Sequence, residues 1–261
     1  MKEKQLQPLV SVVIPTLNDA RNLCRVLPLI PEFVHEIVLV DGHSTDDTDT
    51  VVQQLGLTIR APIHIIKQTA KGKGDALRVG FATSSGDIIV TLDADGSTDP
   101  REIPLFVEAL KRGNDFAKGS RSILGGGSHD FTLLRRLGNY GLRTLVNILF
   151  QTGFSDLCYG YNAFWKHCLD HIEIDCDGFE VETLIHLRVH KANLRIIEVP
   201  SVEYRSIYGK SNLRAFRDGW RVLRAIMRER DGNLPPLSQA PYRMNPYIIT
   251  DFSSVPEEIV L

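Results

Sequence analysis

The sequence predicts an α/β fold in which a mostly parallel sheet is flanked by helices. The first observation is an alternation, because short apolar runs bounded by turn residues are followed by helical patterns throughout the first half of the chain. The second is that three of these runs end in polar residues, the position at which open α/β sheets bind ligands. The third is size and composition, since 261 residues with 43% hydrophobic and 24% charged residues suit one large soluble domain.

Four apolar runs predict strands, and the patterns between them predict helices. The strands are expected at residues 9–14, 36–40, 63–66 and 87–92, and the helices at 20–27, 46–55, 74–82 and 100–111. Acidic residues at 46 and 47 and the pair Asp99-Pro100 are typical of helix starts. In the second half we expect helices at 133–150 and 180–190, a strand at 194–199 and a loop at 204–211. The pattern at 133–150 is compatible with packing on the core, on a second subunit or on lipid.

Charge, cysteine content and hydropathy argue against several classes of protein. The formal net charge is −2, so no bulk charge favours nucleic acid. The four cysteines form no CxxC pair, which favours reduced thiols in a cytoplasmic protein over a zinc site. Residues 1–8 lack the apolar segment of a signal peptide, and no window approaches the roughly 18 apolar residues that span a bilayer. Any membrane contact is therefore expected to be peripheral.

Two carboxylates follow the fourth predicted strand. Asp93 and Asp95 come directly after the apolar run at 88–92 and are two residues apart. Carboxylate oxygens are the ligands that Mg²⁺ and Mn²⁺ prefer, and these cations share their remaining positions with substrate phosphates. Because Asp, Gly and Ser also favour turns, a simple turn is the alternative. The pattern predicts a divalent-cation site on Asp93 and Asp95.

Polar residues in neighbouring loops support a nucleotide site. Asp41 ends the second predicted strand and can accept hydrogen bonds from a base or a ribose, while Thr16, Asn18 and Asp19 follow the first strand. The segment at 71–74, Lys-Gly-Lys-Gly, brings cations and glycines to the start of a helix whose N-terminus favours anions.

Five motifs, in this order, resemble those of the family 2 glycosyltransferases of the GT-A fold over about residues 9–230. They are VVIPTLND at 12–19, EIVLVDGHS at 36–44, KGKGDAL at 71–77, DADG at 93–96 and KGSR at 118–121. The resemblance implies a Rossmann-like GT-A domain over residues 1–230, with a donor half at about 9–121 and an acceptor half at about 122–230. An irregular, proline-containing tail would follow at 231–261.

The resemblance also implies an inverting transfer of a sugar from a nucleoside-diphosphate sugar, either GDP-mannose or a UDP-sugar. Mg²⁺ or Mn²⁺ would be the cofactor, and as the cation held by Asp93 and Asp95 it would stabilise the leaving diphosphate. The residues implied in donor binding are Pro15, Thr16, Asn18, Asp19, Asp41, Ser44, Lys73, Gly74, Asp93, Ala94 and Asp95.

Two segments of the second half resemble the acceptor segments of dolichol- or polyprenyl-phosphate mannosyltransferases. They are SDLCYGYN at 155–162 and YRSIYGKS at 204–211. The implied acceptor is a polyprenyl phosphate, and two positions differ from the pattern, because Ser97 replaces a glutamine and Asn162 replaces an arginine. The residues implied as phosphate ligands are Arg121, Arg205, Lys210 and Ser211.

A soluble hydroxyl acceptor, such as a natural product or a saccharide, is the alternative for the same chemistry. A nucleotidyltransferase and a non-catalytic nucleotide-sugar binding module are further alternatives. A phosphate acceptor is already anionic at neutral pH, whereas a hydroxyl needs a general base within hydrogen-bond reach. Glu182 is the first candidate for that base and Asp156 the second, beside the catalytic cation ligand Asp95. Glu182 and Asp156 can equally be buried hydrogen-bond acceptors or acidic residues on a helix surface, without a catalytic role.

Residues 212–230 predict a basic amphipathic helix. It suits the surface of an anionic membrane at its cytoplasmic face, and packing of the apolar stripe on the core is the alternative. The apolar stripe consists of Leu213, Phe216, Trp220, Leu223 and Met227, and the arginines that follow it one residue later are Arg214, Arg217, Arg221, Arg224 and Arg228.

Overall fold

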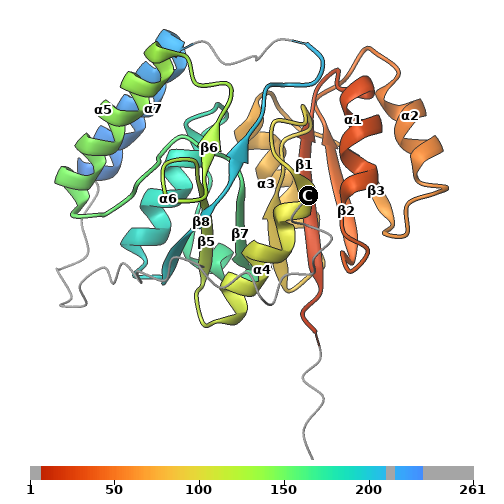
Figure 1. Cartoon of the computed structure of the whole chain (residues 1–261), viewed down its shortest axis with the longest axis horizontal. Helices are drawn as coiled ribbons and strands as arrows, with labels where there is room; N and C mark the ends of the chain where they lie inside the picture. Colours follow the sequence, from red (N-terminus) through yellow and green to blue (C-terminus); the bar gives the residue numbers. More distant parts are fainter. Residues whose placement is uncertain (1–6, 210–214, 232–261) are drawn as a thin grey trace, which may run out of the picture.

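A seven-stranded sheet forms the centre of the molecule (Figure 1). The structure is a computed structural model, and it describes residues 7–209 and 215–231. The strand order is β3-β2-β1-β4-β7-β5-β8, and β6 and β9 pair as a separate ribbon. The strands are β1 Val10–Thr16, β2 Glu36–Asp41, β3 Ile63–Lys67, β4 Ile88–Thr91, β5 Phe116–Ser120, β6 Gly127–Ser128, β7 Asn162–Trp165, β8 Ile196–Pro200 and β9 Val202–Glu203.

Helices cover both faces of this sheet. The α-helices are α1 Ala20–Val26, α2 Thr48–Leu55, α3 Lys73–Thr83, α4 Ile103–Lys111, α5 Leu133–Phe150, α6 Val181–Lys191 and α7 Ala215–Asp231, with 3₁₀ turns at Leu27–Leu29, Pro100–Glu102 and Lys166–His171. The predicted mostly parallel α/β sheet is confirmed. Strand β7 is antiparallel to both of its neighbours, β4 and β5, and the sequence analysis did not predict it.

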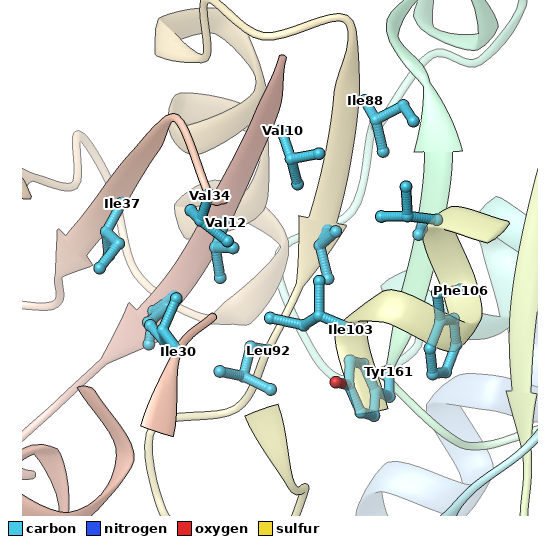
Figure 2. Close-up of a cluster of buried hydrophobic side chains, with 14 of the residues drawn as sticks. Val10, Val12, Ile30, Val34, Ile37, Ile88, Leu92, Ile103, Phe106 and Tyr161 are labelled. Atoms are coloured by element: carbon cyan, nitrogen blue, oxygen red, sulfur yellow. The ribbon is translucent and has the colours of Figure 1, made fainter. Parts of the chain in front are cut away.

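Alternation along the central strands separates two apolar cores. Val10, Val12 and Ile14 on β1 face one core, which they share with side chains from α1, α2 and α4. Figure 2 shows part of this core, where Val12 and Ile37 lie near Ile30 and Val34, and Ile103 and Phe106 of α4 lie near Tyr161. Val13 of β1 faces the opposite core, which includes side chains from α3, α5, α6 and α7. The sheet is therefore buried on both sides, as parallel sheets require.

Helices α5 and α7 lie side by side beyond one end of the sheet (Figure 1). Their C-terminal ends meet the last turn of α6, because His190 hydrogen-bonds the carbonyl of Phe150 on α5 and Lys191 contacts Glu229 on α7 at 2.9 Å. Their first halves consequently lie together at the opposite end. Within the described residues, no helix is both long enough and apolar enough to cross a membrane.

The predicted boundaries agree closely where the pattern is strong. The helix expected at 133–150 is α5, with the same bounds, and its start is capped by Thr132, whose hydroxyl accepts a hydrogen bond from the amide of Arg135. Strand β5 was not predicted as a strand, and the motif KGSR at 118–121 overlaps its last three residues. Lys210, Ser211, Leu213, Arg214 and residues 232–261 of the expected tail lie outside the described residues.

Candidate functional site

The loops after β1, β2 and β4 meet at one edge of the sheet. Strands β1 and β2 are parallel and end in register at Thr16 and Asp41, and β4 pairs with β1 on its other side. The loops bind each other directly, since the amide of Asn18 donates to Ser44 Oγ at 2.8 Å and the amide of Thr45 donates to Asn18 Oδ1 at 2.7 Å. The expectation that these loops share one edge is confirmed.

Asp41 is fully buried and held by strong donors. Lys67 Nζ lies 2.6 Å from one carboxylate oxygen, and the hydroxyl and amide of Ser44 donate to the carboxylate as well. Burial raises the pKa of Asp41, but the hydrogen bonds from Lys67 and Ser44 outweigh it, so the pKa lies below its ordinary value. Asp41 is therefore an ionised, buried carboxylate at the end of β2, where the three loops meet. Lys67 was not among the predicted site residues, although it ends the neighbouring strand β3.

Negative charge accumulates around the loop after β4. Burial raises the pKa of Asp95, and the nearby Asp93 raises it further. Burial also raises the pKa of Asp19, and Asp46 and Asp93 add to that shift against hydrogen bonds from Asn22 and Leu17. Asp93 thus lies within electrostatic range of both Asp95 and Asp19, and this accumulation of negative charge favours a cation beside them.

The donor atoms of Asp93 and Asp95 fit Mg²⁺ or Mn²⁺. Both residues offer hard carboxylate oxygens, and Asp95 is oriented by the amide of Ser97, which donates to Oδ1 at 2.9 Å. Across residues 7–209 and 215–231 no group of three or more His, Cys, Asp or Glu side chains has the arrangement of a metal site. A cation bound here must take its remaining ligands from a substrate or from water, as Mg²⁺ does when it binds phosphates.

Lys73 joins this edge to the second half of the chain. Its ammonium nitrogen lies 2.6 Å from Asp93 Oδ1 and 2.6 Å from Glu182 Oε1 on α6. Burial lowers the pKa of Lys73, but the two carboxylates outweigh it, so the lysine is charged. Burial raises the pKa of Glu182, and Asp93 adds to the shift against the effect of Lys73. Gly160 makes this pair possible, because a Cβ there would lie 2.4 Å from Glu182 Oε1.

The glycines of the 71–74 segment contact the chain itself. The amide of Gly74 donates to the carbonyl of Asp177 at 2.9 Å, and a Cβ on Gly74 would lie 2.0 Å from the carbonyl oxygen of Cys176. These glycines allow the start of α3 to pack on the segment before α6. This packing sets the position of Lys73, the first residue of α3.

Arg121 and Asp156 form a buried ion pair. The guanidinium donates to both carboxylate oxygens, at 2.7 and 2.9 Å, and also to Glu203 at 3.0 Å. Burial raises the pKa of Asp156, but the hydrogen bond and charge of Arg121 outweigh it and hold the pKa well below its ordinary value. The two candidate general bases thus have different partners. Asp156 forms an ion pair with Arg121, whereas Glu182 forms one with Lys73, which also contacts Asp93.

A basic cavity of about 340 Å³ lies beside this ion pair. Arg143 lines it with a buried Nε that has no hydrogen-bond partner within residues 7–209 and 215–231, and its terminal nitrogen donates to the carbonyl of Ser155 at 3.1 Å. Arg136 is exposed. The cavity is lined by Arg121, Ser122, Gly127, Ser128, Phe131, Arg136, Asn139, Tyr140, Arg143 and Ser155.

Arg136 and Arg143 were not among the predicted site residues. The sequence does contain a signal for these two arginines. Residues 136, 139, 140 and 143 are three or four positions apart on the predicted helix at 133–150, so their side chains share one face. Arg205, predicted to bind the same phosphate as Arg121, lines a different cavity of about 340 Å³ with Arg25 and Arg101. The two predicted phosphate ligands therefore line different cavities.

The ion pair of Arg121 and Asp156 yields a pH-dependent prediction. Asp156→Asn should lower the free energy of unfolding by about 3 kcal/mol at pH 7, because one partner of a buried charge pair is lost. The folded pKa of Asp156 is depressed, so its contribution is present above the ordinary value of 3.8 and is lost as the pH falls below it. Denaturant unfolding at pH 7 and pH 3 measures the difference, which should shrink at pH 3.

Asp177→Asn is the matched control, since Asp177 forms an exposed ion pair with Arg78 at 3.1 Å. Little change is expected for it at either pH. A loss for Asp156→Asn that is equal at both pH values would contradict the assignment of the ion pair.

Known proteins similar to this chain identify its family. The family model described as "Glycosyl transferase family 2" matches residues 11–172. A dolichol-phosphate mannosyltransferase of Pyrococcus furiosus is 32% identical over 198 residues, which cover 73% of this chain and 55% of that protein. A polyprenol monophosphomannose synthase of Mycolicibacterium smegmatis is 30% identical over 202 residues, covering 72% of this chain and 75% of that protein. The chain thus spans about half the length of the first relative.

Solved structures show the same fold at low identity. Glucosyl-3-phosphoglycerate synthase from Mycobacterium tuberculosis, crystallised with Mn²⁺, UDP and glucosyl-3-phosphoglycerate, has a TM-score of 0.65 at 20% identity and covers 86% of this chain and 80% of its own. A further structure of that enzyme, with Mg²⁺ and UDP, has a TM-score of 0.66. From the family match and the two relatives, we conclude that this chain belongs to glycosyl transferase family 2.

Proposed function

We propose that the chain transfers a hexose from a nucleoside-diphosphate sugar to a polyprenyl phosphate, with a divalent cation on Asp93 and Asp95. The observation that carries the proposal is the collection of carboxylates at the edge where the β1, β2 and β4 loops meet. The relatives named for dolichol and polyprenol phosphate, and the synthase crystallised with Mn²⁺ and UDP, support the two substrate classes.

The donor would occupy the edge formed by these three loops. We assign the base or ribose to Asp41, with Pro15, Thr16, Asn18 and Ser44 beside it. Thr16 supports the assignment, because its hydroxyl is buried and none of the residues that the structure describes forms a hydrogen bond with it. The bound cation would neutralise the charge of the leaving diphosphate. Lys73, already 2.6 Å from Asp93, adds a fixed positive charge on the same side.

The acceptor chemistry agrees with the state of Glu182. An anionic phosphate oxygen attacks the anomeric carbon and forms the new bond as the bond to the diphosphate breaks, with inversion. No proton has to be removed from a phosphate acceptor. Glu182 contacts Lys73 at 2.6 Å and Asp156 contacts Arg121 at 2.7 Å, so both carboxylates are engaged in ion pairs. This commitment favours a phosphate acceptor over a hydroxyl, which would need a free base.

The basic cavity offers a place for the acceptor phosphate. Arg143 supplies a buried, unpartnered donor and Arg136 an exposed guanidinium. The cavity adjoins the first half of α5, where apolar side chains are exposed, including Leu133 at 74%. A phosphate group with a long apolar chain matches a basic cavity beside an apolar surface. The exposed apolar residues of this half are Leu133, Leu134, Leu137 and Tyr140.

The first half of α7 extends this apolar surface toward a membrane. Phe216 is 81% exposed and Trp220 is 62% exposed, while Val222 and Ile226 face the core instead. Arg217, Arg221 and Arg224 are exposed beside them. Because α5 and α7 run parallel, their apolar first halves lie together, and we propose that they contact the cytoplasmic face of an anionic membrane.

Asp95→Asn tests the cation site. The variant should lose transfer by roughly a hundredfold or more, since several kcal/mol of stabilisation of the leaving diphosphate are removed. In a thermal-shift panel of GDP- and UDP-sugars, the wild-type protein should be stabilised by one donor only when Mn²⁺ or Mg²⁺ is present, and Asp95→Asn should not respond.

Asp47→Asn is the matched control, because Asp47 is exposed and its side chain makes no capping hydrogen bond at the start of α2. It should retain both the shift and the activity. A donor that stabilises wild type and Asp95→Asn equally, with or without cation, would overturn the site assignment.

Flotation with vesicles tests the membrane contact. Wild-type protein should float with vesicles rich in phosphatidylglycerol, less so at high salt, because arginines contribute to the attraction. The double variant Phe216→Ser/Trp220→Ser should bind severalfold more weakly without losing the fold, since both side chains are exposed. Leu57→Ser is the control, because Leu57, in the turn after α2, is 87% exposed. A wild-type protein that stays with the soluble fraction at low salt would contradict the proposal.

A further inference from the structure

The segment 204–209 lies across the loop that carries Asp93 and Asp95. The amide of Tyr204 donates to the carbonyl of Ser97 at 2.8 Å, and the amide of Ile207 donates to the carbonyl of Asp95 at 3.1 Å. Gly96, at φ +75°, leaves the space that Ile207 fills, because a Cβ there would lie 2.5 Å from Ile207 Cδ1. The two segments are therefore fitted to each other through both backbone and side chain.

Asn22, on α1, holds the far end of this segment. Its Oδ1 accepts from the amide of Tyr208 at 2.9 Å, and its Nδ2 donates to the carbonyl of Tyr208 at 3.1 Å. The side-chain amide of Asn22 thus binds both the backbone amide and the carbonyl of Tyr208, as the backbone of a neighbouring strand would. Arg21, the preceding residue, places its guanidinium 4.2 Å from the centre of the Tyr208 ring.

The same Asn22 amide also reaches the loop after β1. Nδ2 donates to Asp19 Oδ1 at 2.8 Å, and Asn22 is only 3% exposed. Asp19 in turn lies within electrostatic range of Asp93. One buried side chain therefore contacts the proposed donor loop through Asp19 and the segment 204–209 through Tyr208.

We propose that Asn22 is a positioning residue that couples occupation of the donor loops to the placement of the segment 204–209. Two of the attachments of this segment, the carbonyl of Asp95 in the loop after β4 and the side-chain amide of Asn22 in the first turn of α1, adjoin the loops that would close on a donor and its cation. A ligand that fixes Asp19 and Asp95 also fixes the acceptor-side segment, and by linkage the reverse holds. The role of the ligand rests on the proposed function, whereas the two attachments do not.

Hydrogen exchange of the full chain tests this coupling directly. Without nucleotide, Asn22→Ala should speed exchange at the amide of Tyr208 by about tenfold, the loss of one net hydrogen bond. Asn22→Asp keeps an acceptor for that amide but turns a second oxygen toward the carbonyl of Tyr208 and the carboxylate of Asp19. It should loosen the segment at least as much. Asn114→Ala is the control, because Asn114 Nδ2 donates to the carbonyl of Ala109 at 2.7 Å, far along the chain from this contact.

The second arm adds Mn²⁺ with GDP or with UDP. In wild type the nucleotide that binds should slow exchange at Ile207 and Tyr208, and in Asn22→Ala the slowing at Tyr208 should be lost while that at Ile207 remains. Unchanged exchange at Tyr208 in Asn22→Ala, or a change matched by Asn114→Ala, would overturn the proposal. If neither nucleotide affects any amide of wild type, the proposed donor and the coupling to it both fail, whereas the nucleotide-free comparison still decides whether Asn22 holds Tyr208 in place.

Discussion

The ammonium group of Lys73 between Asp93 and Glu182 is the interaction on which the rest of the site depends. Asp93 follows β4 in the first half of the chain, and Glu182 lies on α6 in the second half. The ammonium nitrogen of Lys73 joins the two halves, because it lies 2.6 Å from a carboxylate oxygen of each residue. Three largely buried charges at one point are stable only when they compensate each other. The close packing of Gly74 on Cys176 and of Gly160 beside Glu182 holds them in place.

The second half of the chain repeats this principle with different residues. The guanidinium of Arg121 lies over the rings of Phe131 and Tyr159, and its charge is opposed by Asp156 and Glu203. Its position beside α5 defines one wall of the basic cavity. Charges that are paired internally give rigid walls, while Arg136 is exposed and the buried Nε of Arg143 has no hydrogen-bond partner among the described residues. The proposed acceptor phosphate is thus met by α5 rather than by the buried ion pair.

Much of the fold follows from local pattern, and the rest from pairing between distant residues. The helix at 133–150 shows a cap and a long periodic stretch, so its bounds are readable from the sequence. Strand β7 has four residues without alternation, and only the neighbours β4 and β5 make it a strand. Asp93 was predictable because it follows an apolar run. The contact of Lys73 with Glu182, 109 positions away, follows from how α3 and α6 pack.

The amphipathic pattern of α7 shows the same limit. The periodicity predicted an apolar stripe and a basic stripe on this helix. Whether the apolar stripe packs on the core or contacts a membrane depends on which of its side chains are buried in the fold. Val222 and Ile226 enter the core, which leaves Phe216 and Trp220 exposed next to the apolar half of α5. That rotation of the helix is fixed by its contacts with α5 and α6, which no local pattern records.

The central claim is most directly tested by identifying the product. The protein is incubated with Mn²⁺, a panel of GDP- and UDP-hexoses and a polyprenyl phosphate in detergent, and the lipid fraction is analysed by mass spectrometry. The account predicts a polyprenyl phosphate that has gained one hexose, together with an equal amount of free nucleoside diphosphate. Release of pyrophosphate instead, or transfer only to a soluble hydroxyl compound with the lipid unchanged, would contradict it.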